Sequence, residues 1–401
     1  MDRTQIERIV REVVSANASL PASSLDRAGT SARTTGRAAV LTSKEHLELR
    51  EFPLRPIRGD EILVRVEACG ICGTDIHCYK NDPFDLCPVV LGHEGTGEVL
   101  EVGESVRMDS VGKPVRPGDR IVTSILETSD ACMIAKYNPL KANLCDDLRI
   151  YGLLPDSPDN HFNGYFGEYL IIRPGSSFFV VNDLSEDLRV LIEPAAVVCH
   201  ALDRAKSCGA TLNFRTRVIV QGCGPIGLMM IAVLRTYGIN TIIAIDGNPA
   251  RLEWAQRLGA DHTINYKDHS GPEGVAAAVG EVTKGLGAHF AFQATGVPQA
   301  TANLIQSVRR GGGICELGHF VDGGSAPFNP HLDFCKKEIT LIGSWAYNSW
   351  EYPNAYHFLD RAEKIGLPVA GLITHRFSLE KIQDAFDTAL RQEGIKIVVK
   401  T

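Results

Sequence analysis

Cysteine, histidine and acidic residues cluster in three segments of the chain that lie far apart. Cys69 and Cys72 come first, His93 and Glu94 follow about twenty residues later, and Glu193 stands much further along, directly before a proline. Thiolate, imidazole and carboxylate groups all bind zinc, and three protein ligands with an open fourth position form a catalytic zinc site. These spacings are not those of a compact zinc finger, so the residues predict a catalytic zinc assembled from distant segments.

Three of these residues have alternative interpretations. Cys69 and Cys72 form a Cys-x-x-Cys pattern, which also occurs in redox pairs, although no thioredoxin-like sequence surrounds it here. Glu193 precedes a proline and could cap a helix instead of binding a metal.

A glycine-rich motif predicts a dinucleotide site. Gly222-Cys223-Gly224-Pro225-Ile226-Gly227 stands between the apolar run Val218–Gln221 and a helix-like stretch at Leu228–Tyr237. In such a motif the first glycine permits a tight turn, the second lets the backbone approach a pyrophosphate, and the third allows close helix packing. The helix N-terminus supplies N–H donors and positive potential.

Asp246 ends the next predicted strand and can accept both hydroxyls of an adenosine ribose. It would repel a 2′-phosphate, and Gly247 rather than a basic residue follows, with Arg251 one turn further on, so NAD is favoured over NADP. Alternatively, Asp246 caps a helix at Asn248–Leu258. The predicted cofactor-binding residues of this region are Gly222, Gly224, Pro225, Ile226, Gly227, Asp246 and Arg251.

These motifs must be positioned by two kinds of structure. From Ala38 to about Asp183, short alternating segments such as Glu61–Val66 and Glu98–Val102 are separated by Gly, Pro and Asp turns, which predicts a mainly β domain. After Pro194, short apolar strands alternate with longer helix-like stretches, which predicts βαβ units around a parallel sheet. The expected strands there are Val218–Val220, Thr241–Ile245, Phe290–Phe292 and Gly313–Leu317. The final segment mixes turns with one helix, roughly Leu379–Arg391.

Composition bounds the class of partner. The 401 residues include 41 basic and 48 acidic side chains, a net charge of −7, without a long single-sign run. This argues against nucleic acid or an anionic membrane as the main partner and favours a small molecule. The most apolar stretch, 217–234, is interrupted by polar and helix-breaking residues, so no transmembrane segment is expected. Eleven cysteines without a recognisable secretory leader predict reduced thiols or metal ligands in a cytoplasmic protein rather than a disulfide framework.

The first residues form a separate unit. Ile6, Ile9, Val10 and Val13 share one helical face, which predicts an amphipathic helix over 1–15, followed by a flexible small-residue linker over 16–37. Such a helix, too short to be stable alone, resembles the encapsulation peptides that direct enzymes into bacterial microcompartments. A tail without a partner, or a helix packing on its own subunit, are equally open interpretations.

Taken together, the motifs resemble the zinc-dependent medium-chain dehydrogenase/reductase family, nearest to its polyol (sorbitol-like) and threonine dehydrogenase branch. The resemblance covers roughly Ala38 to Thr401 and rests on four motifs in the family's order. It implies an α/β fold with a GroES-like, mainly β catalytic domain over 38–193, a Rossmann domain over 194–341, and a return to the catalytic domain over 342–401. It also implies a homo-oligomer, a dimer or tetramer.

The family resemblance assigns roles at the metal site. The Gly-Ile-Cys-Gly-Thr-Asp motif supplies Cys72 as first ligand, Gly-His-Glu supplies His93, and Glu193 binds zinc directly or through water. Glu94 is an adjacent alternative ligand or supports the ligands. The zinc stabilises an alkoxide, so that an alcohol can transfer hydride to the nicotinamide.

The same resemblance implies a proton path and one further cofactor contact. The substrate proton leaves through the hydroxyl of Thr74 and the nicotinamide ribose to His77, and histidine exchanges protons readily near neutral pH. His77 could instead be a solvated structural residue. Lys396 matches a basic position that touches the cofactor pyrophosphate in relatives.

One part of the family pattern is missing. Relatives carry a structural zinc on a lobe with the spacing Cys-x2-Cys-x2-Cys-x7-Cys, but counting back from Cys145 reaches Tyr137, Ile134 and Ala131. Cys132 is one residue out of register. Two cysteines cannot complete a tetrahedral thiolate site, so this lobe is expected to hold no metal.

The sequence therefore predicts an oxidoreductase that transfers hydride between NAD(H) and a secondary alcohol or polyol. The alternatives are an aldehyde or phosphonate-type alcohol dehydrogenase of the same family, and a catalytically silent NAD-binding protein. Residues that flank the motifs are candidates for the substrate-pocket wall, although each could equally be core: Tyr79, Phe162, Phe166 and Trp345.

Overall fold

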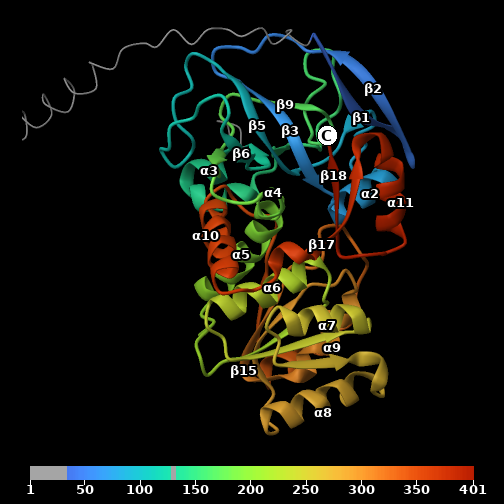
Figure 1. Ribbon diagram of the computed structural model, residues 1–401. Coiled ribbons are helices and arrows are strands. Elements are labelled where there is room, and N and C mark those ends of the chain that lie inside the picture. The colour runs from blue at the N-terminus through green and yellow to red at the C-terminus, as the bar shows by residue number, and fades with distance from the viewer. Residues whose placement is uncertain (1–33, 128–131) are drawn as a thin grey trace, which may run out of the picture. The chain divides into compact units, whose positions relative to one another are not determined.

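The computed structural model describes residues 34–127 and 132–401 (Figure 1). The predicted helix over 1–15 and residues 16–33 of the predicted linker lie outside this part of the chain. Strand β1 (Thr35–Ser43) begins inside the segment predicted as linker, so the boundary at residue 37 is wrong by a few residues. The reason is strand pairing, because Thr35 already lies opposite Pro53 of β2 (His46–Pro53).

The β portion contains three sheets. The largest has seven strands in the order β10-β6-β5-β3-β18-β17, with β9 also paired to β3; β1 lies between β2 and β4 in a second sheet, and β7 pairs with β8 in a third. The strands of the largest sheet are β10 (Phe178–Val180), β6 (Arg120–Thr123), β5 (Glu94–Val102), β3 (Ile62–Gly70), β18 (Lys396–Lys400), β17 (Ile373–Ser378) and β9 (Tyr169–Ile172). The short strands of the other two are β4 (Val89–Val90), β7 (Leu126–Glu127) and β8 (Arg149–Ile150).

The second portion is built on a six-stranded sheet in which every neighbouring pair is parallel, in the order β13-β12-β11-β14-β15-β16. Its strands are β11 (Arg217–Gln221), β12 (Thr241–Asp246), β13 (His262–Asn265), β14 (Ala288–Gln293), β15 (Val308–Glu316) and β16 (Thr340–Gly343). This is the doubly wound order in which the chain reverses direction between β11 and β14, where ligands bind at the carboxyl ends of the strands. The predicted α/β class is confirmed.

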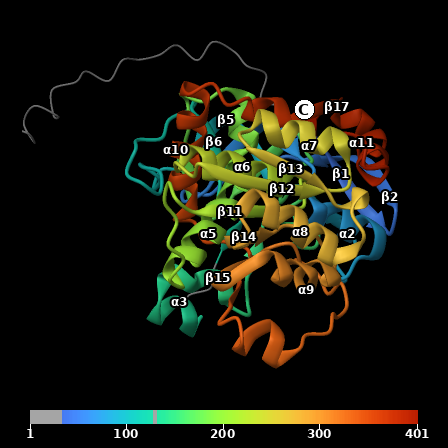
Figure 2. The ribbon, with the colours of Figure 1, turned by 90° about the horizontal axis from the view of Figure 1, so that it is seen from below.

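Helices cover both faces of this sheet (Figure 2), which explains why its strands are continuously apolar. In β11, Val218 and Val220 pack in one hydrophobic cluster with α5, α6 and α10, whereas Ile219 packs in another with α8 and α9. The helices of this portion are α5 (Ile192–Ser207), α6 (Pro225–Thr236), α7 (Pro249–Arg257), α8 (Gly271–Thr283), α9 (Pro298–Ser307) and α10 (Glu351–Lys364).

The remaining helices are α2 (Gly73–Asn81), α3 (Met133–Tyr137), α4 (Glu186–Val190) and α11 (Ile382–Leu390). Single turns occur at Pro139–Leu144, Tyr266–Asp268, Pro330–Cys335, Val369–Leu372 and Leu379–Lys381. The last sixty residues divide between the two portions, because α10 packs against α5 and α6 while β17, β18 and α11 join the β portion. The predicted boundaries at 193/194 and 341/342 fall inside α5 and β16.

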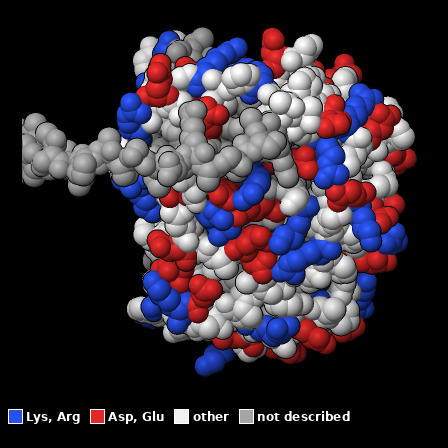
Figure 3. Space-filling model, turned by 45° about the horizontal axis from the view of Figure 1, so that its top comes forward, with Lys and Arg blue, Asp and Glu red and all other residues white. Residues whose placement is uncertain are grey.

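Within the described residues, no helix is long and apolar enough to cross a bilayer. Lysine and arginine side chains are interspersed with aspartate and glutamate over the face seen in Figure 3.

Candidate functional site

Helix α2 brings three of the predicted residues to one cleft. Cys72 is the residue before its first turn, and its backbone N–H donates to the carboxylate of Asp75 at 2.9 Å. The hydroxyl of Thr74 lies 3.7 Å from Cys72 Sγ. Thr74 is buried and His77, three residues further along the helix, is exposed, yet both line the same cavity of about 460 Å³. One helical face therefore leads from the cleft interior to solvent.

His93 enters the cleft from the turn before β5. Its Nδ1 lies 3.4 Å from Asp75 Oδ1, too poorly aligned for a hydrogen bond, and is buried with no hydrogen-bond partner among the described residues. Burial alone would lower the pKa of His93, but the charges of Asp75 and Cys72 raise it well above its ordinary value. A histidine whose Nδ1 faces a carboxylate has its Nε2 left for a metal. Asp75, which sequence reasoning missed, thus positions both Cys72 and His93.

Glu94 and Lys396 form a buried ion pair. Lys396 Nζ lies 2.7 Å and 2.5 Å from the two oxygens of Glu94 and donates to the carbonyl of Ile71 at 3.2 Å. The prediction that Lys396 touches the cofactor pyrophosphate is wrong. The cause is the antiparallel pairing of β18 with β3, which places the lysine, 3 % exposed, beneath the cleft and beside β5. Glu94 lines the cleft, but its carboxylate is already paired.

Glu193 lies in the first turn of α5 and is held by a tyrosine. The hydroxyl of Tyr347 donates to Glu193 Oε1 at 2.5 Å and lies 3.3 Å from the hydroxyl of Tyr352. Burial, and next the charge of Glu94, raise the pKa of Glu193 to about 7. Tyr347 follows β16 and lies far from the motifs in sequence, so no local signal identified it.

The donor set fits a zinc ion. Cys72, His93 and Glu193 would hold it, since they offer sulfur, nitrogen and oxygen donors and line one cavity. The carboxylates of Glu94 and Glu193 are both buried and their negative charges repel each other. Lys396 offsets the charge of one of them, and a divalent cation would offset the charge of the other. Within the described part of the chain, three possible ligand atoms come within 4.8 Å of one another only at Cys132, Cys145 and Asp147. The ligand atoms of the cleft set therefore lie further apart than this.

The glycine motif has the geometry that its sequence predicts. Gly222 has φ of +90°, and a Cβ there would lie 2.5 Å from the methyl group of Thr295. A Cβ at Gly227 would overlap the carbonyl oxygen of Gly222, so the helix and turn could not approach as they do. Pro225 opens α6 directly after Gly224.

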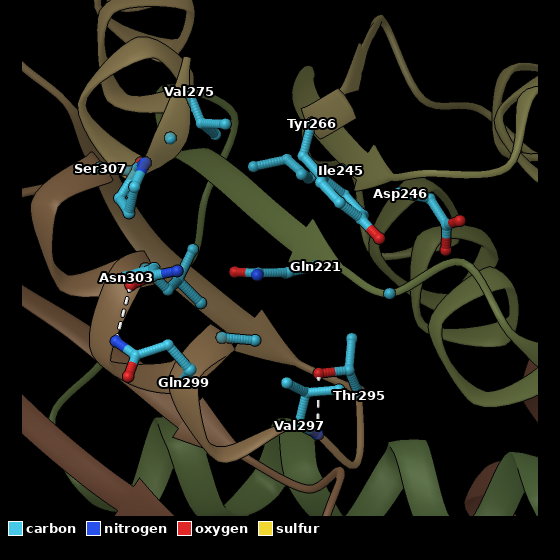
Figure 4. A pocket seen from close by; sticks show the side chains of 15 residues that line it. Gln221, Ile245, Asp246, Tyr266, Val275, Thr295, Val297, Gln299, Asn303 and Ser307 are labelled. Carbon is cyan, nitrogen blue, oxygen red and sulfur yellow. Dashed lines mark hydrogen bonds between the residues drawn. The ribbon is translucent and has the colours of Figure 1, made fainter. Parts of the chain in front are cut away.

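A second cavity, of about 380 Å³, lies beside this motif at the carboxyl ends of β11 and β12 (Figure 4). Asp246 stands at its mouth next to Ile245 and Tyr266, and its carboxylate accepts from the N–H groups of Cys223 at 2.7 Å and Asn248 at 2.8 Å. The cap of α7 is Asn248, which accepts from Ala250 N, so the interpretation of Asp246 as the helix cap is wrong. Arg251 is not among the residues that line this cavity.

The two cavities meet along one backbone stretch. Thr295 lines the cavity beside Asp246, while its neighbours Ala294 and Gly296, together with Ile226, line the cleft with the metal ligands. An extended dinucleotide can therefore place one end beside Asp246 and the other beside Cys72.

The aromatic wall of the cleft differs from the prediction. Of the four candidates only Trp345 lines it, stacked on Phe320 with ring centroids 4.8 Å apart. Tyr79, Phe162 and Phe166 are buried in the β portion's cores, because they face inward from elements whose motifs face the cleft.

The lobe that was expected to lack metal contains a disulfide between Cys132 and Cys145. The prediction of reduced thiols or metal ligands is wrong for this pair, because α3 and the helical segment Pro139–Leu144 between them bring their Cα atoms to 6.0 Å. The other nine cysteines are free. Asn143 of the lobe donates to the carbonyl of Trp345 at 2.7 Å, and Asn348 donates to Leu140 O at 3.0 Å, so the lobe supports the cleft wall.

Known proteins share both portions. Residues 58–183 match the family described as the alcohol dehydrogenase GroES-like domain, and residues 225–361 match the family described as zinc-binding dehydrogenase. The chain is 32 % identical over 369 residues to sorbitol dehydrogenase of Bacillus subtilis, covering 90 % of this chain and 96 % of that protein.

Solved structures agree with these matches. An alcohol dehydrogenase of Thermotoga maritima has a TM-score of 0.84 at 28 % identity, covering 91 % of this chain and 99 % of its own. A zinc-binding dehydrogenase of Sinorhizobium meliloti, bound to NADP, has a TM-score of 0.78 at 26 % identity, covering 92 % and 100 %.

Proposed function

The chain belongs to the zinc-dependent medium-chain dehydrogenase family and is an alcohol or polyol oxidoreductase that uses a nicotinamide cofactor; from this premise we propose the residues and the substrate class through which it acts. Cys72, His93 and Glu193 hold the zinc, and the substrate is a secondary alcohol or a polyol. The observation that carries the proposal is the convergence of these three side chains with Ile226, beside the glycine motif, in one cleft.

When bound, the zinc would supply a Lewis acid for the alcohol oxygen, and the nicotinamide would supply a hydride acceptor. The residues of this chain manage the proton. Thr74, buried beside Cys72, accepts a hydrogen bond from the substrate hydroxyl, and His77, exposed at the outer end of the same helical face, passes the proton to solvent. Asp75 keeps His93 oriented, and Tyr347 holds Glu193 at the junction of the two portions.

The substrate-class proposal rests on the cleft wall. The Phe320–Trp345 stack provides an apolar face, while His77, Asn81 and Asp322 provide polar groups, a combination that suits a chain carrying several hydroxyls. A panel of alcohols, polyols and aldehydes, assayed on protein of measured zinc content, tests it. Faster turnover of simple primary alcohols or aldehydes than of every secondary alcohol and polyol would contradict it. No turnover of any of these compounds would indicate a silent NAD-binding protein.

We also propose a preference for NAD. Asp246 is fixed by two backbone N–H groups at the mouth of the adenosine cavity, where its charge repels a 2′-phosphate. The expected result is a higher kcat/KM with NAD than with NADP, and the reverse order would contradict it. Asp246→Asn should narrow the difference.

A homo-oligomer is the proposed assembly, supported by the edge of the parallel sheet. Within the described residues β16 pairs only with β15, and its Leu341 is exposed, so this edge offers backbone groups to a second copy. Sedimentation at several concentrations tests the assembly. A monomer at all of them would contradict it.

For the N-terminal segment, which lies outside the described residues, the proposal is docking of the apolar face of residues 1–15 on a microcompartment shell, within the cytoplasm. Residues 1–37 fused to a fluorescent protein and co-expressed with shell proteins of the source organism provide the test. Diffuse fluorescence would count decisively against shell docking, and would favour a tail or a helix that packs on its own subunit.

A further inference from the structure

A third cavity lies at the opposite edge of the parallel sheet from the cofactor. It has a volume of about 750 Å³ and is lined by residues of β11, β12, β14, β15 and β16, mostly near the amino ends of these strands, and by the loops before β11 and β14. It shares no lining residue with the cavity beside Asp246. The catalytic reaction proposed above therefore gives it no role.

The charge of this cavity, here called the basic pocket, is one-sided. Arg215, Arg217 and Arg309 line it, and no aspartate or glutamate does. None of these three guanidinium groups forms an ion pair with a carboxylate in residues 34–127 and 132–401, although many other arginines of the chain do. Three unpaired like charges around one hollow repel one another, and an anion between them would relieve that repulsion.

A histidine adds an oriented donor. His289 Nδ1 accepts a hydrogen bond from the backbone N–H of Arg217 at 3.2 Å. The proton of the neutral ring is consequently on Nε2, for which the described residues provide no acceptor. Burial, and then the charges of Arg309, Arg217 and Arg215, lower the pKa of His289, which favours the neutral ring.

The floor and the rim suit a ligand larger than a bare ion. Gly311, Gly312 and Gly313 of β15 line the pocket, and Gly311 is exposed with open space where a side chain would stand. Phe214 and Leu286, 71 % and 63 % exposed, stand at its edge as free apolar surfaces. The volume lies within the range of small-molecule sites.

We propose that the basic pocket binds a small organic phosphate, whose phosphate group contacts the three arginines and His289 Nε2 and whose apolar or ring portion lies against Phe214. Guanidinium forks match phosphate oxygens in pairs, which makes arginine the usual residue for such recognition. A nucleoside monophosphate and a sugar phosphate share this chemistry, and the experiment distinguishes them.

Isothermal titration of the NADH-saturated, zinc-loaded enzyme tests the proposal, because bound NADH blocks the cofactor site. The probes are inorganic phosphate, a hexose 6-phosphate and adenosine 5′-monophosphate. At least one organic phosphate is expected to bind saturably and more tightly than inorganic phosphate. Stronger binding of the monophosphate would identify Phe214 as a base platform, and Phe214→Ala should then remove the difference.

The chain offers a matched control pair. Arg309 lines the basic pocket and Arg310, its neighbour, is exposed but does not line it. Arg309→Gln should weaken binding about 10-fold or more, and Arg310→Gln less than about 2-fold, since hydrogen bonds to charged groups are worth that much and long-range charge is screened. Dehydrogenase activity should be unchanged in both.

Three results would overturn the proposal. The first is no saturable binding of any probe by the wild-type enzyme. The second is equal weakening by Arg309→Gln and Arg310→Gln, which would indicate nonspecific charge attraction. The third is a sedimentation coefficient that changes in Arg217→Gln with no phosphate present, which would make the pocket a contact between copies of the chain.

Discussion

Of two cysteine-bearing regions of this molecule, one lines the cleft and the other is hydrogen-bonded to the segment that forms its wall. At Cys72 the thiol is free, and nearby side chains hold His93 and Glu193 in place from different elements. At the lobe, Cys132 and Cys145 are bonded to each other, and two asparagine side-chain amides tie the lobe to the cleft wall. A cysteine such as Cys72 can serve as a metal ligand when neighbouring residues orient the other ligands of the site. The Cys132–Cys145 pair has no such oriented ligands and serves as a covalent link.

The largest effect on catalysis should follow from removing one of the proposed zinc-binding side chains. Cys72→Ala or His93→Ala should lower kcat by a factor of about 1,000 or more, because the alkoxide would lose its stabilising cation. NADH affinity, measured by fluorescence titration, should change little, since the cavity beside Asp246 is separate from the zinc-binding side chains. Unchanged turnover in either variant would refute the metal assignment.

Removing the disulfide of the lobe should lower the stability of the protein and leave its catalytic activity unchanged. Cys132→Ser should lower the free energy of unfolding by about 3 kcal/mol, the value for a loop of roughly 15 residues, as measured by denaturant unfolding. Zinc content should be unaffected. If this variant lost the catalytic zinc as Cys72→Ala does, the separation of the two regions would be wrong.

Asp75→Asn tests whether the carboxylate beside Cys72 and His93 contributes to zinc affinity. The amide keeps the size of the side chain but removes the charge facing His93 Nδ1, so zinc affinity should fall about 10- to 100-fold. A chelator competition assay measures it. The matched control is Asp85→Asn, a neutralisation in the loop after α2 that should leave the affinity unchanged.

The smallest effect is expected at the outer end of the proton path. His77→Ala should slow alcohol oxidation a few-fold, most at low pH where solvent offers few bases, and added buffer base should partly restore the rate. A pH profile identical to that of the wild type would remove His77 from the mechanism.

Much of this fold could be predicted because its signals are local. The glycine motif and the carboxylate that ends the next strand follow each other within one βαβ unit, so spacing alone located them. Thr74 and His77 are three residues apart in α2, so their shared face follows from helical periodicity, and Cys72 directly precedes that helix.

What could not be predicted depends on strand pairing and on contacts across the sequence. Lys396 reaches Glu94 only because β18 inserts beside β3, and Tyr347 reaches Glu193 across 154 positions. The disulfide was missed because Cys132 is out of register with the family's zinc pattern, although register is irrelevant to a thiol that needs one partner rather than three. The basic pocket joins residues from five strands and from the loops before β11 and β14, and it has no sequence motif.

The claim that zinc is held at Cys72 and not at the Cys132–Cys145 lobe is tested by the zinc content per chain. Elemental analysis would compare the wild type, Cys72→Ala and the double variant Cys132→Ser/Cys145→Ser. One zinc ion is expected in the wild type, one in the double variant and none held tightly in Cys72→Ala. Two zinc ions per chain in the wild type, or a zinc that survives in Cys72→Ala and leaves in the double variant, would contradict it.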